Sequence, residues 1–163
     1  MAALGPVEQT LRVFETIDAH FKANPALLNT DGIFRISSAG RKHIDLAEAI
    51  QNNHKIDWSQ YSAHDCANAL KYVLLQVRLL PATDTRVELF MAQIQDPKRD
   101  PNALKRLITS LQNSDSDLKI AEIINIALDI CCRTTIQEKY NRMSPTNLAV
   151  VWGPAFQHCL NME

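Results

Sequence analysis

Apolar side chains recur every three or four residues along most of this chain. The opening segment shows the pattern clearly, in the series Val7, Leu11, Phe14, Ile17 and Phe21. At 3.6 residues per turn these positions share one face of a helix, so an amphipathic helix is predicted from Gly5 to Asn24. Pro6 suits its first position, and the Asn24-Pro25 pair is expected to end it.

The same spacing predicts further helices along the chain. We expect them at roughly 39–51, 62–80, 84–95, 101–111, 117–133 and from 144 onward. Serine caps are predicted for four of them, at Ser37 or Ser38, at Ser62 with Asp65 in a capping box, at Ser114 or Ser116, and at Ser144. The segment 117–133 is almost continuously apolar, which favours a central position. No segment shows the period of a strand, so an all-α fold is predicted.

Bulk properties narrow the class of protein. The chain has 163 residues, and a chain of this length is expected to form one domain with one core. We expect the domain to be a monomer. A formal net charge of -1 provides no global attraction to nucleic acid or to anionic lipid. No run approaches the roughly 20 apolar residues of a membrane span, and no basic-then-apolar leader opens the chain.

The residues that commonly bind metals show no ligand spacing. The four cysteines, at positions 66, 131, 132 and 159, contain no C-x-x-C pattern, and the five histidines are scattered. Reduced cysteines that serve as small core residues in a reducing compartment explain this pattern. We therefore expect a cytoplasmic protein with no metal and no cofactor of its own.

Residues 31–38, D-G-I-F-R-I-S-S, are the most informative short stretch. The Asp-Gly pair predicts a tight turn, because glycine accepts the positive φ that such turns require. Ile33 and Phe34 are expected to be buried, which would leave Arg35 projecting from a short anchored loop. An isolated arginine is more often a surface ion-pair residue, so this pattern alone indicates only a helical domain with one unusual loop.

Three stretches together resemble the RhoGAP domain family. Residues 31–38 resemble its arginine-finger loop, with G-I-F-R followed by a small-residue turn. Residues 141–154, N-R-M-S-P-T-N-L-A-V-V-W-G-P, are similar to its N-x-M-x-x-x-N-L-A-x-x-x-x-P segment. Residues 64–71, H-D-C-A-N-A-L-K, are similar to its basic second helix. The order and approximate spacing agree from about Val7 to Phe156.

The resemblance implies a single RhoGAP-like domain over residues 1–163, an all-α bundle of about seven to eight helices. Relatives usually continue with another helix after the position of Glu163, so that helix is expected to be missing. The implied function is binding of GTP-loaded Rho-family small GTPases and acceleration of their GTP hydrolysis. Arg35 would enter the partner's active site in trans, while GTP, Mg²⁺ and the attacking water belong to the partner. On this hypothesis the chain is an activator rather than an enzyme.

Four further residues are implied to bind the GTPase: Lys71, Arg78, Asn147 and Asn141. Lys71 and Arg78 would also steady the finger loop. In the family the lysine and arginine are usually four residues apart, whereas here they are seven apart, and a helix longer by one turn would keep both on one edge. Arg78 fits a solvated charge equally well. Asn141 fits equally a residue that satisfies backbone groups at a helix start.

Two rival functions stay open. Ser38 stands where the family has glycine, and the altered spacing before Arg78 could shift the basic pair. A GTPase-binding adaptor with weak or no acceleration is therefore an alternative, although the presence of Arg35 argues against it. A purely structural helical module, or one that contacts lipid headgroups, is a second alternative that the neutral charge balance does not support.

Overall fold

The computed structural model describes residues 4–98 and 100–162, and this part of the chain contains eight α-helices, three short 3₁₀ helices and no strand. The α-helices are α1 (Pro6–Ala23), α2 (Lys42–Gln51), α3 (Ala63–Leu75), α4 (Thr85–Gln95), α5 (Ala103–Gln112), α6 (Leu118–Ile136), α7 (Glu138–Asn141) and α8 (Pro145–Cys159). The 3₁₀ helices are η1 (Pro25–Asn29), η2 (Trp58–Gln60) and η3 (Asp115–Asp117). The predicted all-α fold and helix number are confirmed.

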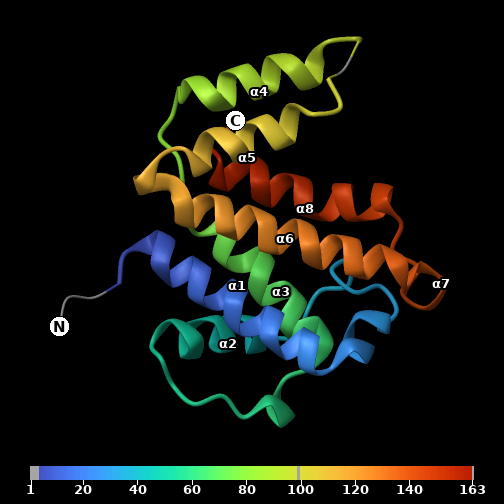
Figure 1. Ribbon diagram of the computed structural model, residues 1–163. Helices are drawn as coiled ribbons and strands as arrows, with labels where there is room; N and C mark the ends of the chain where they lie inside the picture. Colours follow the sequence, from blue (N-terminus) through green and yellow to red (C-terminus); the bar gives the residue numbers. More distant parts are fainter. Residues whose placement is uncertain (1–3, 99, 163) are drawn as a thin grey trace.

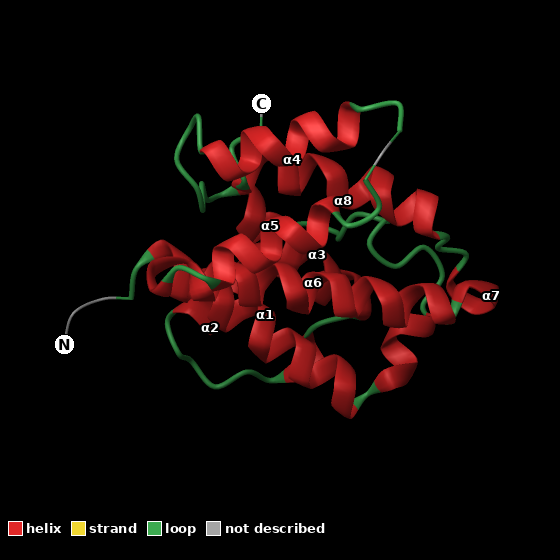
Figure 2. Cartoon of the chain, turned by 45° about the horizontal axis from the view of Figure 1, so that its top comes forward, coloured by secondary structure: helices red, strands yellow, loops and turns green. Residues whose placement is uncertain are grey.

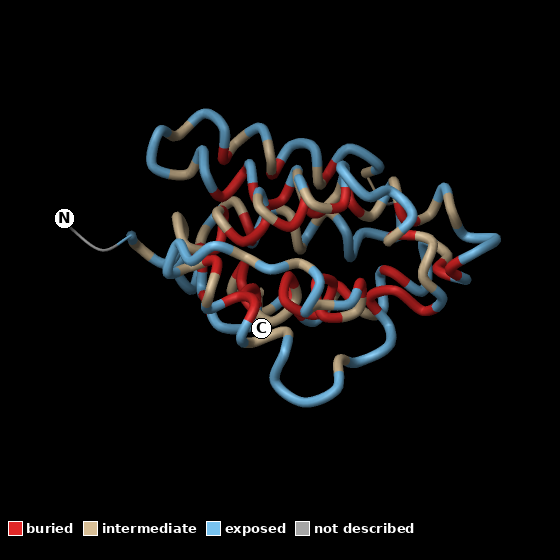
Figure 3. The backbone as a smooth tube through the Cα atoms, turned by 90° about the horizontal axis from the view of Figure 1, so that it is seen from below, coloured by how far each residue is buried: buried red, intermediate tan, exposed pale blue. Residues whose placement is uncertain are grey.

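The long helix α6 lies in the middle of the bundle, as its apolar sequence predicted (Figure 1). Helices α1, α5 and α8 contact it, while α3 connects α1, α2 and α8 on the other side. Helix α4 is outermost and packs mainly against α5. The buried positions line the inward faces of the helices, and the exposed positions follow the outer faces and loops (Figure 3). None of the described helices is both long enough and apolar enough to cross a membrane.

Two of the predicted serine caps are present. The Ser62 hydroxyl accepts a hydrogen bond from the Asp65 amide at 3.1 Å, and the Asp65 carboxylate accepts one from the Ser62 amide at 2.9 Å, which is the expected capping box. Ser144 caps α8 by accepting from the Asn147 amide at 3.1 Å. These bonds satisfy backbone donors that a helix start otherwise leaves unpaired.

The other two serine caps were predicted wrongly. Helix α2 begins at Lys42 without a side-chain cap, because the Ser38 hydroxyl donates instead to the His64 carbonyl at 3.2 Å. Helix α6 follows η3 directly, and neither Ser114 nor Ser116 caps it. At α2 a longer turn takes up residues 39–41, which the spacing pattern had assigned to the helix start. At α6 the expected start is nearly correct, but η3 occupies the place of the serine cap.

The predicted end of the third helix, near residue 80, is also wrong. Helix α3 ends at Leu75, and in residues 76–80 exposed Arg78 lies between buried Val77 and buried Leu79. The Leu79 amide donates to the Cys159 carbonyl at the end of α8, at 2.7 Å. This bond between segments distant in sequence replaces the next helical turn, so Arg78 does not lie on α3.

Candidate functional site

The finger loop, residues 31–38, connects η1 to the turn before α2 (Figure 2 shows the loops in green). Gly32 has a φ of 68°, and its carbonyl accepts hydrogen bonds from the amides of Arg35 at 2.8 Å and Ile36 at 2.9 Å. The predicted Asp-Gly turn is therefore present. Ile33 and Phe34 are fully buried, as expected from the pattern of the loop.

Phe34 holds an uncommon backbone conformation directly before Arg35. Its φ of 72° lies in the left-handed region, which costs a bulky residue roughly 1–3 kcal/mol. Its ring is held in the core by Trp152 of α8, at a centroid distance of 5.2 Å, and by Phe21 of α1, at 6.5 Å. Burial of the ring thus fixes the bend that turns the next residue outward.

Arg35 itself is exposed at the tip of this bend. Among the residues that the structure describes, none forms an ion pair or hydrogen bond with its guanidinium group. The neighbouring Asp31 carboxylate pairs with Arg142 instead, at 3.5 Å. An exposed guanidinium on a fixed loop can donate two parallel hydrogen bonds to a phosphate or carboxylate of another molecule.

Helix α3 supplies two donors to the loop. The Lys71 ammonium donates to the Phe34 carbonyl, and the burial of this side chain lowers the pKa of Lys71. The Asn68 side-chain amide donates to the Ile36 carbonyl at 2.9 Å and to the His64 carbonyl at 2.8 Å. The carbonyls on both sides of Arg35 are therefore held from one helix.

The sequence pattern points to Lys71 but not to Asn68. The available signal was that Asn68 lies three residues before Lys71, on the same face of a helix. That spacing alone does not distinguish a loop anchor from any other polar residue on the helix.

Asn141 is fully buried under the loop. Its side-chain nitrogen donates to the carbonyls of Leu28 and Thr134, both at 2.8 Å, and its side-chain oxygen accepts from the Met143 amide at 2.7 Å. Its own carbonyl accepts from the Gly32 amide at 2.8 Å. Of the two alternatives for Asn141, this arrangement favours satisfaction of backbone groups, because the buried side chain presents no surface to a partner.

Asn147 belongs to the first turn of α8, whereas Arg78, from the segment after α3, contacts the last turn of α8. Asn147 is exposed in the first turn, where its side chain donates to the Arg142 carbonyl at 3.2 Å. Arg78 donates to the His158 carbonyl at 2.8 Å, near the other end of the helix. Eleven residues of α-helix span about 16 Å, so the structure does not place Arg78 beside Asn147.

The expectation that Lys71 and Arg78 share one helix edge is therefore wrong. The residue one turn after Lys71 on α3 is Leu75, whose exposed fraction is 43%. A pocket of about 230 Å³ opens beside these residues. It is lined by His43, Asn68, Lys71, Tyr72, Leu75, Val151, Pro154 and Ala155.

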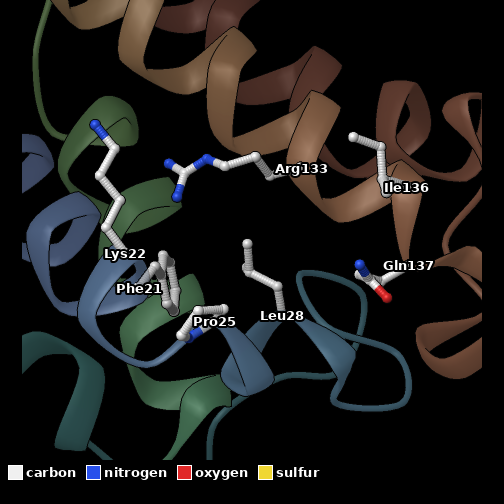
Figure 4. Close-up of a pocket in the computed structure, with 7 residues that line it drawn as sticks. All are labelled: Phe21, Lys22, Pro25, Leu28, Arg133, Ile136 and Gln137. Atoms are coloured by element: carbon white, nitrogen blue, oxygen red, sulfur yellow. The ribbon is translucent and has the colours of Figure 1, made fainter.

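A second pocket, of about 270 Å³, lies between α1, η1 and the end of α6 (Figure 4). It is lined by Phe21, Lys22, Pro25, Leu28, Arg133, Ile136 and Gln137. Lys22 and Arg133 both pair with the Asp18 carboxylate, and Arg133 also pairs with Asp129, so two carboxylates compensate these two charges. None of the predicted site residues lines this pocket. Within residues 4–98 and 100–162, no cluster of three or more His, Cys, Asp or Glu side chains could hold a metal ion.

Comparison with known proteins identifies relatives of this chain. The family model of the RhoGAP domain matches residues 19–161. The chain is 28% identical over 146 residues to Rho GTPase-activating protein 45 of Xenopus laevis, covering 76% of this chain and 13% of that protein. It is 26% identical over 134 residues to a probable Rho-GTPase-activating protein 7 of Schizosaccharomyces pombe, covering 78% of this chain and 19% of that protein.

A solved structure shows the same fold. The crystal structure of human Rho GTPase activating protein 15 matches with a TM-score of 0.70 at 19% identity, covering 88% of this chain and 67% of that chain. The two sequence relatives are much longer, and this chain spans less than a fifth of either.

Proposed function

This chain belongs to the RhoGAP family, and from that premise we propose that it binds GTP-loaded Rho-family small GTPases and accelerates their GTP hydrolysis. Arg35 is the proposed catalytic residue and acts in trans. The GTPase supplies the nucleotide, Mg²⁺ and the attacking water. The domain acts as a monomer in the cytosol, where it meets this partner.

The observation that carries this proposal is the exposure of Arg35 on a loop whose backbone is fixed on both sides. Phosphoryl transfer develops negative charge on the transferred group and on the leaving oxygen, and a positioned cation stabilises that charge. Arginine suits this role because its planar fork is always charged and donates two parallel hydrogen bonds. Because the backbone of the loop is already fixed, only the Arg35 side chain has to be ordered when the partner binds, which limits the cost in conformational entropy.

The remaining residues have supporting roles in this proposal. Lys71 holds the Phe34 carbonyl and borders the surface that meets the GTPase. Asn147 is an exposed contact in the first turn of α8, whereas Asn141 acts indirectly by holding Gly32. Arg78 lies beside the C-terminal end of α8, so it would contact the GTPase only if the interface extended along that helix.

Single-turnover GTP hydrolysis over a panel of Rho-family GTPases tests the proposal. Arg35→Ala is expected to lower the stimulated rate constant by about 10³-fold or more, and Arg35→Lys to recover little of it. Affinity for the GTP-loaded partner should change much less, since the interaction is made mainly in the transition state. The matched control is Arg106→Ala, which removes an exposed, ion-paired arginine from α5.

GDP with a planar metal fluoride, a mimic of the transition state, should tighten the wild-type complex but not the Arg35→Ala complex. Equal stimulation by wild type and Arg35→Ala would show that Arg35 is not the finger. Binding of the wild type without any stimulation would instead establish the adaptor alternative.

Asn147→Val tests the proposed contact at α8. If Asn147 meets the GTPase, the affinity should weaken by about 1–3 kcal/mol, because a partner group loses its hydrogen bond on a desolvated surface. If its main role is the bond to the Arg142 carbonyl, the melting temperature should fall while the affinity stays intact. Both quantities are measured on the same purified variant.

A further inference from the structure

The side chain of Asn68 is buried in the middle of α3 and reaches the finger loop. Its exposed fraction is 8%, and its amide nitrogen meets two carbonyl oxygens, those of Ile36 and His64. Because both neighbours are acceptors, the nitrogen rather than the oxygen must face them, which fixes the orientation of the amide. Both hydrogens of the amide are then used.

The position of the acceptor in the loop gives this bond its significance. Ile36 directly follows Arg35, and Phe34, held by Lys71, directly precedes it. Two donors one turn apart on α3 therefore hold the peptide unit directly before Arg35, through the Phe34 carbonyl, and the carbonyl of the next residue, Ile36. Because the residues on either side of Arg35 are held at these two carbonyls, the loss of either hydrogen bond lets the backbone at Arg35 shift and changes the direction of its guanidinium.

The two side chains that hold the loop, Lys71 and Asn68, differ in flexibility. Lys71 reaches the loop through a long stem with several rotatable bonds, whereas Asn68 is short and enclosed. The His64 carbonyl that Asn68 contacts also accepts from the Ser38 hydroxyl at 3.2 Å. The exit of the loop, residues 36–38, is thus tied to the first turns of α3 through a small rigid network, and Asn68 lies at its centre.

We propose that Asn68 is a positioning residue for the activation reaction, which aims Arg35 by holding the Ile36 carbonyl. This inference rests on the proposed function of Arg35. Catalysis that depends on orientation is sensitive to small displacements, and a shift of about 1 Å can cost about 10²-fold in rate. Asn68 does not touch the GTPase and acts only through Arg35.

The first test separates rate from affinity. Asn68→Ala is expected to lower the stimulated rate constant at saturating domain by about 10²-fold, while affinity for the GTP-loaded partner stays close to that of the wild type. Affinity for the GDP–metal fluoride form should fall with the rate. The matched control is Asp65→Ala, which removes the carboxylate half of the capping box of α3, and should lower the melting temperature without lowering the rate constant.

The second test is a double-mutant cycle with Arg35. If Asn68 acts only through Arg35, adding Asn68→Ala to Arg35→Ala should not lower the residual rate any further. A merely structural role predicts the same loss in both backgrounds, in proportion to the fraction of protein that unfolds. Hydrogen exchange of residues 36–38, measured without the partner, should accelerate in Asn68→Ala by more than its loss of global stability explains. In Asp65→Ala it should change only as far as the global stability changes.

A wild-type rate constant for Asn68→Ala, or an equal loss in the Arg35→Ala background, would overturn the inference and leave the function of Arg35 standing. A wild-type chain that stimulates no GTPase in the panel would overturn both. The two failures are therefore distinguishable.

Discussion

At the scale of single residues, Gly32 and Phe34 form the bend by which the finger loop presents Arg35. Both have φ near 70°, a conformation that glycine adopts easily and phenylalanine does not. Gly32 is also close to its neighbours: an added Cβ would lie 2.6 Å from the Ile36 side chain and 3.0 Å from the Arg35 guanidinium. The bend therefore requires glycine at one position and a core anchor at the other.

Gly32→Ala should accordingly damage both stability and activity. The left-handed φ costs alanine about 1–2 kcal/mol, and the methyl group displaces Ile36 and Arg35. We expect a lower melting temperature and a stimulated rate constant below that of the wild type.

Two other glycines provide matched controls for this prediction. Gly40 also has positive φ, at 62°, but has open space around it, so Gly40→Ala should show the backbone strain alone. Gly153 lies in α8 with open space, and Gly153→Ala should be neutral or stabilising by about 0.5–1 kcal/mol. A Gly32→Ala variant that matches Gly40→Ala in both stability and rate would contradict the steric argument.

Lys71 leads to a prediction for pH dependence. Its burial lowers its pKa below the ordinary value of 10.5. Between the lowered and the ordinary value, the unfolded chain binds a proton that the folded chain has lost, so the contribution of Lys71 to the free energy of unfolding rises as pH rises. The unfolding free energy of the wild type minus that of Lys71→Met should therefore increase through this alkaline window.

Urea unfolding at a series of pH values measures this difference. Lys42→Met is the exposed control, because its ammonium also donates to a backbone carbonyl, that of Gln60 at 2.9 Å. A flat profile for Lys71→Met would mean that burial does not penalise the charge of Lys71 in the folded state.

The residues of the site differ in how far the sequence reveals them. The burial of Ile33 and Phe34 and the exposure of Arg35 follow from local pattern and agree with the structure. The role of Asn141 could not be assigned, because its partners Leu28 and Thr134 come from η1 and α6. Asn68 was missed for the same reason: its acceptor lies 32 residues away.

At the scale of elements, the spacing of apolar residues located the long helices, and errors concentrated at their ends. The end of α3 was misplaced because Val77, Leu79 and Leu80 are apolar and buried in a non-helical segment, which the spacing alone could not separate from a helical stripe. The short α7 was not predicted, since four residues carry no helical periodicity. In both places a contact distant in sequence decides the local structure.

Arg86 joins two elements and provides a prediction at this scale. It bonds to Asp84, the cap of α4, at 2.8 Å, and to Asp117, at the start of α6, at 2.7 Å. The hydrogen bonds from Arg86 to Asp84 lower the pKa of Asp84, and the two ion pairs together tie the outermost helix to the central one. Arg86→Ala should destabilise the fold by about 1–3 kcal/mol, because two largely buried carboxylates lose their partner.

Thermal melts and hydrogen exchange measure this effect, and exchange should accelerate most in α4. Arg106→Ala removes a more exposed pair and is expected to cost at most about 1 kcal/mol. The stimulated GTPase rate should stay unchanged in both variants, since neither residue approaches the finger loop. A loss of rate in Arg86→Ala would show that α4 communicates with the site.

At the scale of the whole molecule, the finger loop belongs to the core while α4 lies at the periphery. Phe34 joins an aromatic cluster with Phe21 and Trp152, which come from α1 and α8. The Gly32 amide is buried and bonded to the Asn141 carbonyl. Helix α4, in contrast, has only one buried residue, Val87.

This arrangement predicts an order of opening. Native-state hydrogen exchange in low urea should show that the Gly32 amide exchanges only with global unfolding, with a free energy that falls steeply as urea increases. The amides of α4 should exchange through a local opening with a smaller free energy and a weaker dependence on urea. The site would then survive fluctuations that detach α4, because nothing that holds Arg35 in place belongs to that helix. A Gly32 amide that exchanges as readily as those of α4 would show that the loop opens on its own, and a rigid presentation of Arg35 would no longer explain activation.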